Sequence, residues 1–257
     1  MKKLTFQDLQ VLPYQVEESL NRIRVNFGFI GPEYKKIIVT SSTENEGKSF
    51  VSFNIWRMLA EAGKSAVFVD ADLRQSILRN RYKIAGEKEG YLGLAFYLSG
   101  RATIQDIVYE TNVPNGYFVP VSYTVSNPAL LLQGKRFPNL LDTLADNFDY
   151  VIVDTPPLTA VADGDLIASH CDGAILVVRG GVTPRKLIAN AMKQLENANC
   201  KLLGTVLNRV ELSNSSYYYR KYYGKGKYYN NYYSSYGSDS KPTPEEAKLS
   251  EQDAATK

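Results

Sequence analysis

Short apolar runs alternate with helical patterns through most of this chain. The runs are four to six residues long and lie at residues 37–40, 66–70, 117–121, 150–154, 174–178 and 202–207. This alternation is typical of βα units, in which a helix connects each strand to a parallel neighbour. Val151, Ile152 and Val153 are apolar on both strand faces, as expected when helices cover the sheet on each side. The sequence therefore predicts an α/β fold with a doubly wound, mainly parallel sheet and a ligand site at the strands' carboxyl ends.

Composition divides the 257 residues into four regions. Residues 1–32 include a predicted amphipathic helix over residues 16–27, in which Leu20, Ile23 and Phe27 share one face. Residues 33–212 contain the α/β domain. Residues 213–240 are almost wholly Tyr, Ser, Gly, Asn and Lys, and residues 241–257 are polar. The first segment has no aliphatic residue with which to build a core and the second is polar, so both are predicted to be disordered.

Charge, hydropathy and cysteine content exclude several classes of protein. Thirty basic and 27 acidic residues give a net charge of +3, too balanced for the whole molecule to bind nucleic acid. Apolar runs are far shorter than the roughly 20 residues that span a bilayer, and no signal peptide is evident, so we expect a cytoplasmic protein. Two cysteines and one histidine exclude an ordinary zinc site and a disulfide framework.

The first apolar run leads into a loop that ends in the Gly-Lys-Ser of a P-loop (Walker A motif). The loop is Ser42-Thr43-Glu44-Asn45-Glu46-Gly47-Lys48-Ser49. Its N–H groups are expected to bind nucleotide phosphates, with Lys48 on the β- and γ-phosphates and Ser49 on Mg²⁺. Ser42 stands at the first glycine position of the motif, and Asn45 tolerates left-handed dihedrals. Alone, the pattern is also compatible with an ordinary turn and helix N-cap.

Three aspartates end two other predicted strands at the same sheet edge. Asp70 and Asp72 follow the second run in a Walker A′ pattern, and Asp154 ends the fourth run in a Walker B pattern. Asp72, Asp154 and Ser49 are candidate Mg²⁺ ligands, direct or through water, because this ion prefers one or two carboxylates plus phosphate oxygens. Asp70 is then free to accept a proton from an attacking hydroxyl. Capping of the next helix is the alternative for Asp70 and Asp72.

Asn208 closes the last predicted strand. Its amide can donate to and accept from the edge of adenine, which makes it a candidate for base recognition. A simple turn residue is an equally open interpretation.

Ten of the 19 tyrosines fall within residues 217–236. They are Tyr217, Tyr218, Tyr219, Tyr222, Tyr223, Tyr228, Tyr229, Tyr232, Tyr233 and Tyr236. A coil of about 15 residues spans about 20 Å and reaches about 50 Å, so these hydroxyls could enter a nearby kinase site as phosphoacceptors. The segment carries four positive charges and no acid, so about two or three phosphates would reverse its sign. Without the kinase motifs, an aromatic and basic nucleic-acid arm would be the preferred interpretation.

The motifs, in this order and with this tail, resemble the bacterial tyrosine kinases of capsule and exopolysaccharide synthesis whose kinase is separate from its membrane adaptor. The resemblance extends over nearly the whole chain and includes Asp70-Ala71-Asp72-Leu73-Arg74, Tyr97-Leu98-Ser99-Gly100, Asn127-Pro128, Asp154-Thr155-Pro156-Pro157 and residues 173–179. It implies a P-loop protein-tyrosine kinase that uses ATP and Mg²⁺ and phosphorylates its own tail. It also implies that Asp70 is the base and that Asp72 and Asp154 serve Mg²⁺.

The resemblance implies partners as well. The cytosolic tail of a transmembrane chain-length regulator would activate the kinase and recruit it to the inner face of the membrane, and a cognate protein-tyrosine phosphatase would oppose it. Family members assemble into rings through a Glu-x-x-Arg-x-x-Arg helix, which here carries Glu18, Asn21 and Arg24. Asn21 removes one charge-assisted contact, so the ring would be weaker or would use Arg22.

Two other functions compete with this interpretation. A Min/Par-type partitioning or cell-division ATPase shares the fold and the strand-end motifs. Such proteins carry a second lysine near the loop start, where this chain has Thr43, and a basic amphipathic C-terminal helix that this sequence lacks. A nucleotide-binding adaptor without turnover would contain the same residues in an unproductive arrangement.

Overall fold

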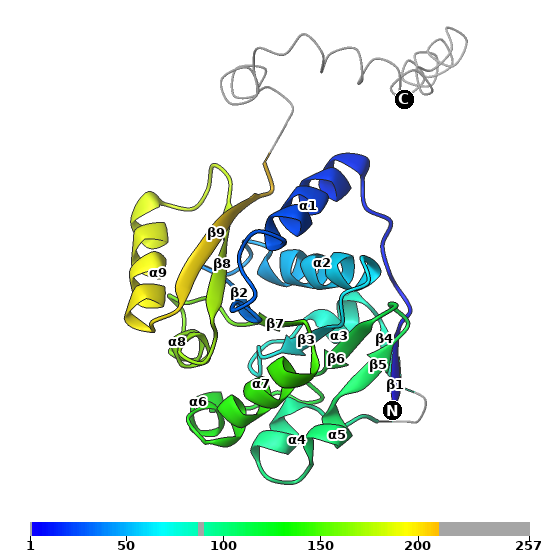
Figure 1. The fold of residues 1–257 in the computed structure, drawn as a ribbon. Helices are drawn as coiled ribbons and strands as arrows, with labels where there is room; N and C mark the ends of the chain where they lie inside the picture. The colour runs from blue at the N-terminus through cyan, green and yellow to red at the C-terminus, as the bar shows by residue number, and fades with distance from the viewer. Residues whose placement is uncertain (1, 87–89, 211–257) are drawn as a thin grey trace, which may run out of the picture. The chain divides into compact units, whose positions relative to one another are not determined.

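Nine strands form one sheet in the part of the protein that the structure describes. The computed structural model describes residues 2–86 and 90–210 (Figure 1). The strand order is β4-β1-β5-β6-β3-β7-β2-β8-β9. The strand bounds are β1 Lys3–Phe6, β2 Lys36–Ser41, β3 Ala66–Asp70, β4 Ile84–Gly86, β5 Tyr109–Thr111, β6 Gly116–Val119, β7 Tyr150–Asp154, β8 Gly173–Arg179 and β9 Lys201–Asn208.

Most of the sheet is parallel, with its carboxyl ends aligned. Strands β6, β3, β7, β2, β8 and β9 pair with one another in parallel, whereas β1 with β4 and β5 with β6 are antiparallel. Asp154 of β7 lies opposite Val39 of β2 on one side and Asp70 of β3 on the other. The predicted doubly wound, mainly parallel α/β fold is therefore confirmed, and the acidic strand ends lie side by side.

Helices cover both faces of the sheet (Figure 1). On the sheet face that carries Ile37, α1 and α2 pack into one apolar core. On the opposite face, which carries Ile38, the helices from α4 through α9 pack into a second core. No helix in the described ranges is long and apolar enough to cross a membrane. The helix bounds are α1 Tyr14–Phe27, α2 Lys48–Glu61, α3 Leu78–Arg81, α4 Leu94–Leu98, α5 Ile104–Ile107, α6 Pro128–Leu132, α7 Arg136–Asn147, α8 Asp163–Ala168 and α9 Arg185–Asn197.

The N-terminal residues pack into the same compact unit as the sheet. β1 pairs with β4 and β5, and α1 packs against α2 and buries Leu20 and Phe27. The helix predicted over residues 16–27 begins slightly earlier, at Tyr14. The unit Met1–Val210 is compact. The predicted tail segments, with their ten candidate tyrosines, lie outside the described residues.

An aromatic cluster fills the core between α2 and the sheet. Trp56 is fully buried, and its Nε1–H donates to the backbone oxygen of Ala66 at 3.0 Å. The centroid of its ring lies 5.1 Å from that of Phe53 and 5.6 Å from that of Phe6, separations at which aromatic rings attract one another. Because Phe6 belongs to β1, the cluster also holds the N-terminal strand to the core.

Candidate active site

The P-loop connects β2 to α2 and contains two residues in the left-handed conformation. Asn45 has a φ of 62° and Gly47 a φ of 93°. Asn45 thus adopts the conformation that its side chain was expected to tolerate. Gly47 is the N-cap of α2, so the first N–H groups of this helix have no partner within it and are available to an anion.

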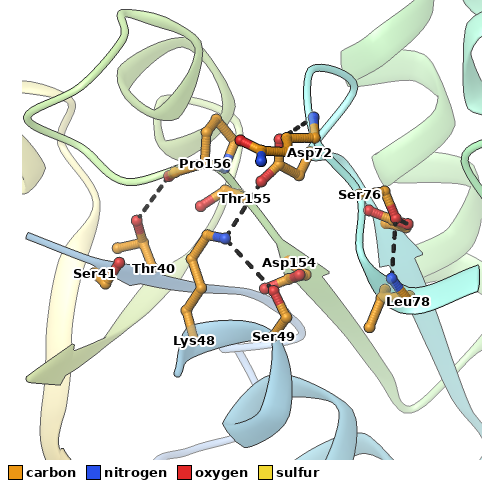
Figure 2. A network of polar contacts seen from close by, with 12 residues as sticks. Thr40, Ser41, Lys48, Ser49, Asp72, Ser76, Leu78, Asp154, Thr155 and Pro156 are labelled. Atoms are coloured by element: carbon orange, nitrogen blue, oxygen red, sulfur yellow. Dashed lines mark hydrogen bonds and ion pairs between the residues drawn. The ribbon is translucent and has the colours of Figure 1, made fainter. Parts of the chain in front are cut away.

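The segment after β7 is hydrogen-bonded to the end of β2, where the P-loop begins. The N–H of Leu158 donates to the backbone oxygen of Ser41 at 3.0 Å. The hydroxyl of Thr40 donates to the backbone oxygen of Pro156 at 3.3 Å (Figure 2). These bonds connect the Walker B segment to the last residues of β2, directly before the P-loop, in addition to the pairing of β7 with β2.

Lys48 lies among the predicted metal ligands. Its Nζ donates to Asp72 Oδ2 at 3.3 Å and to Ser49 Oγ at 3.5 Å (Figure 2). Asp154 accepts a hydrogen bond from the hydroxyl of Ser52 at 3.0 Å. The structure therefore brings together residues from the start of α2 and the ends of β3 and β7.

Three buried carboxylates lie around Lys48. Asp70 and Asp154 are each 1% exposed, and Asp72 is 6% exposed. Burial raises the pKa of Asp154, although Lys48 opposes the rise. Burial alone would lower the pKa of Lys48, but Asp154 and Asp72 raise it overall, so the lysine remains protonated. Three carboxylates around one ammonium group suit an additional divalent cation.

The two carboxylate oxygens of Asp70 differ in their hydrogen bonding. Its Oδ2 accepts a hydrogen bond from the hydroxyl of Ser76, and its Oδ1 is buried with no hydrogen-bond partner among the described residues. Burial raises the pKa of Asp70 well above its usual range, Asp154 and Asp72 add to the rise, and the bond from Ser76 opposes it. A carboxylate with a strongly raised pKa and an unpaired oxygen is a candidate to accept a proton from a hydroxyl.

Asp72 also has a structural contact. Its Oδ1 accepts the N–H of Gln75 at 3.0 Å, a local turn contact of the kind that Asp favours. The capping alternative for Asp70 and Asp72 is therefore wrong, because the next helix, α3, begins at Leu78 with Ile77 as its N-cap and has no side-chain cap bond. Since the other oxygen contacts Lys48, the same carboxylate shapes the turn and faces the site.

Asn208 reaches the P-loop from the end of β9. Its Nδ2 donates to the backbone oxygen of Glu46 at 2.9 Å. A Cβ atom on Gly47 would lie only 2.1 Å from this nitrogen, so the contact requires glycine. Neither interpretation of Asn208 from the sequence included this bond. The second N–H and the amide oxygen leave Asn208 as a candidate for base recognition.

The predicted oligomerisation residues lie on α1. Glu18, Asn21 and Arg24 are half-buried, and Arg24 Nε contacts Asn21 Oδ1 at 3.5 Å. The asparagine thus engages the last arginine of the motif within its own helix. Their contact with a second copy stays a prediction.

Other contacts were missed by sequence reasoning. Arg74 donates from Nε and Nη2 to the carboxylate of buried Asp163 at 2.6 and 3.1 Å, which joins the Walker A′ segment to α8. The hydrogen bonds from the hydroxyl of Ser76 to Asp70 and from the hydroxyl of Thr183 to Glu46 were also not predicted. Arg74 belongs to the Walker A′ motif, but nothing near it in sequence indicates a partner 89 residues away.

Comparison with known proteins defines the class. A family model described as an AAA domain matches residues 34–208. The septum site-determining protein MinD of Pyrococcus horikoshii, solved with Mg-ADP, has the same fold, with a TM-score of 0.59 and 23% identity over 70% of this chain and 72% of that one. With the P-loop geometry, these matches define a P-loop ATPase domain, a class that binds nucleotide.

More similar proteins show which kind of P-loop protein this chain is. The tyrosine-protein kinase CpsD of Streptococcus agalactiae is 40% identical over 211 residues, which cover 82% of this chain and 91% of the relative. The kinase domain of the Escherichia coli tyrosine kinase ETK has a TM-score of 0.68 and 27% identity, over 77% of this chain and 78% of that one. The chain therefore belongs to the bacterial tyrosine-protein kinases. The predicted resemblance is confirmed, and the likeness to MinD is one of fold.

Proposed function

We propose that this kinase transfers the γ-phosphate of ATP to the tyrosines of its own C-terminal tail and thereby regulates capsular or exopolysaccharide synthesis and export. The main support is the convergence of Lys48, Asp70, Asp72 and Asp154 at one sheet edge beside the P-loop. Purified chain incubated with labelled MgATP should acquire phosphotyrosine within residues 217–236. Nucleotide binding without any phosphotyrosine would instead favour the non-catalytic adaptor.

The P-loop supplies the phosphate site. The N–H groups of Ser42 and Thr43 are bound by the Glu46 carboxylate, so phosphate oxygens would use the later N–H groups of the loop and the first turn of α2. Lys48 would exchange part of its contact with Asp72 for the β- and γ-phosphates and offset their charge. Asn208 would contact the base.

The side chains present fit a Mg²⁺ ion. Ser49 and the carboxylates of Asp72 and Asp154 offer oxygen atoms, which are the ligands that Mg²⁺ takes together with phosphate oxygens and water. Ser49, Asp72 and Asp154 would hold it. When bound, Mg²⁺ would offset charge on the phosphates.

Asp70 would accept the proton of the incoming tyrosine. As the phenolic oxygen bonds to the γ-phosphorus, the bond from that phosphorus to the bridging oxygen of ADP breaks and the phenolic proton passes to Asp70. The unpaired Oδ1 supports this role, because it leaves one acceptor position for a substrate hydroxyl.

The proposed partners follow from the family. A transmembrane chain-length regulator would activate the kinase through its cytosolic tail and recruit the cytoplasmic chain to the inner face of the membrane. A protein-tyrosine phosphatase would reverse the modification. A second copy would contact Glu18, Asn21 and Arg24 on α1. We propose no nucleic-acid partner.

Asp72→Asn and Asp154→Asn should each raise the Mg²⁺ concentration required for phosphorylation, because each replaces a charged ligand by a neutral one. We expect a shift of roughly tenfold or more. Titrating Mg²⁺ at fixed ATP measures it, and exposed Asp146→Asn on α7 is the matched control. An unchanged Mg²⁺ requirement in both variants would remove these residues from the metal site.

Asp70→Asn should lower the turnover rate while sparing MgATP affinity. The amide retains the shape of the carboxyl and can still accept a bond from Ser76, but it cannot take up the proton. We expect a loss of roughly 10²–10⁴-fold in kcat, with little change in the dissociation constant of MgATP. A variant that keeps wild-type kcat would rule Asp70 out as the base.

A further inference from the structure

Glu46 lies within the P-loop, yet its side chain is only 2% exposed. Its Oε2 accepts the N–H groups of Ser42 at 2.7 Å and Thr43 at 3.1 Å. Its Oε1 accepts a hydrogen bond from the hydroxyl of Thr183. The carboxylate therefore bonds to the first part of its own loop and to a residue far away in the sequence.

Thr183 belongs to the loop between β8 and α9. Its N–H donates to the backbone oxygen of Arg179 at 3.2 Å, and the N–H of Gly180 donates to the backbone oxygen of Asn208 at 2.9 Å. Pro184, which fixes its own backbone, follows as the N-cap of α9. The Thr183 hydroxyl is thus presented to the P-loop by a well-connected loop at the carboxyl end of β8.

The backbone of Glu46 also takes part in a hydrogen bond. Its backbone oxygen accepts the side chain of Asn208 at the end of β9. Side-chain and main-chain bonds to this one residue therefore connect the phosphate loop to two neighbouring strand ends.

A carboxylate next to a phosphate site is harmful unless it is directed away from the anion. The bonds from Ser42, Thr43 and Thr183 satisfy this buried charge and keep it inside the protein. They also fix the first part of a loop that lacks the first glycine of the usual motif. A loop held in its binding conformation loses less entropy when ligand binds.

We propose that Glu46 and Thr183 form a buried brace that positions the P-loop for nucleotide, with Thr183 as a positioning residue for nucleotide binding. The proposal rests on the nucleotide site of the proposed function. It is independent of tyrosine transfer, because a brace acts on affinity whether or not phosphate is transferred.

The test measures binding of a fluorescent ADP analogue with Mg²⁺ to the full chain. Thr183→Val keeps the side-chain shape but removes the hydroxyl, and should weaken binding by roughly three- to tenfold. Thr183→Ser keeps the hydroxyl and should bind within about twofold of wild type. Thr205→Val, at an exposed position of β9, is the matched control and should bind as wild type does.

Glu46→Gln tests the other half of the brace. One amide oxygen cannot replace both carboxylate oxygens, so we expect binding to weaken by about tenfold or more. Combined with Thr183→Val, the loss should be smaller than the product of the two single losses, because both variants break the same contact. Thermal melts establish that each variant is folded.

Several outcomes would overturn the brace. They are wild-type affinity in Thr183→Val, equal losses in Thr183→Ser and Thr183→Val, or fully multiplicative losses in the double variant. If the wild-type chain itself binds no nucleotide, the proposed function fails together with the brace. Tight binding without tail phosphorylation would leave the brace intact and refute only the transfer.

Discussion

Lys48→Met should abolish phosphorylation of the tail. The change removes the ammonium group that Asp72 contacts at 3.3 Å and that would offset charge on the phosphates. We expect a loss on the order of 10²-fold or more, comparable to removal of a preorganised donor from other active sites. Phosphotyrosine formed from labelled MgATP is the measurement.

The structure also indicates which control this experiment requires. Removing Lys48 leaves the buried carboxylates of Asp72 and Asp154 without its charge, and part of the effect could come from lower stability. Lys64→Met, at an exposed lysine just after α2, is the matched substitution and should keep full activity. A well-folded Lys48→Met chain that still phosphorylates itself would refute the assignment of the P-loop.

Changing the ten tail tyrosines to Phe should eliminate autophosphorylation and preserve MgATP binding. The tail hydroxyls are the proposed acceptors, whereas the phosphate site lies in the folded unit. Tyr82, Tyr97 and Tyr109 of that unit are buried and cannot replace them. Tyr14 is 64% exposed, so Tyr14→Phe in the intact chain is the control and should leave labelling unchanged.

Mixing two variants determines whether transfer occurs between chains. Lys48→Met chain with an intact tail should be labelled by active chain that lacks tail tyrosines, if a tail of this length reaches a neighbouring copy. We expect this labelling, since the family resemblance and the Glu18 to Arg24 motif both indicate assembly. No label at high protein concentration, from a wild-type chain that labels itself, would favour transfer within one chain.

The central sheet could be predicted from the sequence because its strands are apolar on both faces and end in recognisable motifs. The bounds of β3 and β7 match the predicted runs, and the others differ by a few residues. Strands β1, β4 and β5 were missed. They are three or four residues long, and β1 pairs with residues far away in the sequence: Leu4 pairs with Gly86, 82 positions away, and with Thr111, 107 positions away. So short a run has no periodicity, and its partners are set by tertiary contacts.

The candidate site was predictable in part. Lys48, Asp72 and Asp154 could be placed together because parallel strands end at one edge. The burial of the Glu46 side chain could not be predicted, since it depends on a bond from Thr183, which is 137 residues away. The environment of Asp70 likewise depends on the bond from Ser76 and on burial, neither of which a local pattern specifies.

Trp56, the chain's single tryptophan, gives the protein an internal fluorescent reporter. Its indole is fully buried, donates to Ala66 and touches Phe6 of the N-terminal strand. Opening of the core around α2, or release of β1, would expose this ring to water and change its emission. One intrinsic signal can therefore separate unfolding from a local loss of nucleotide affinity in every variant described above, with no added dye.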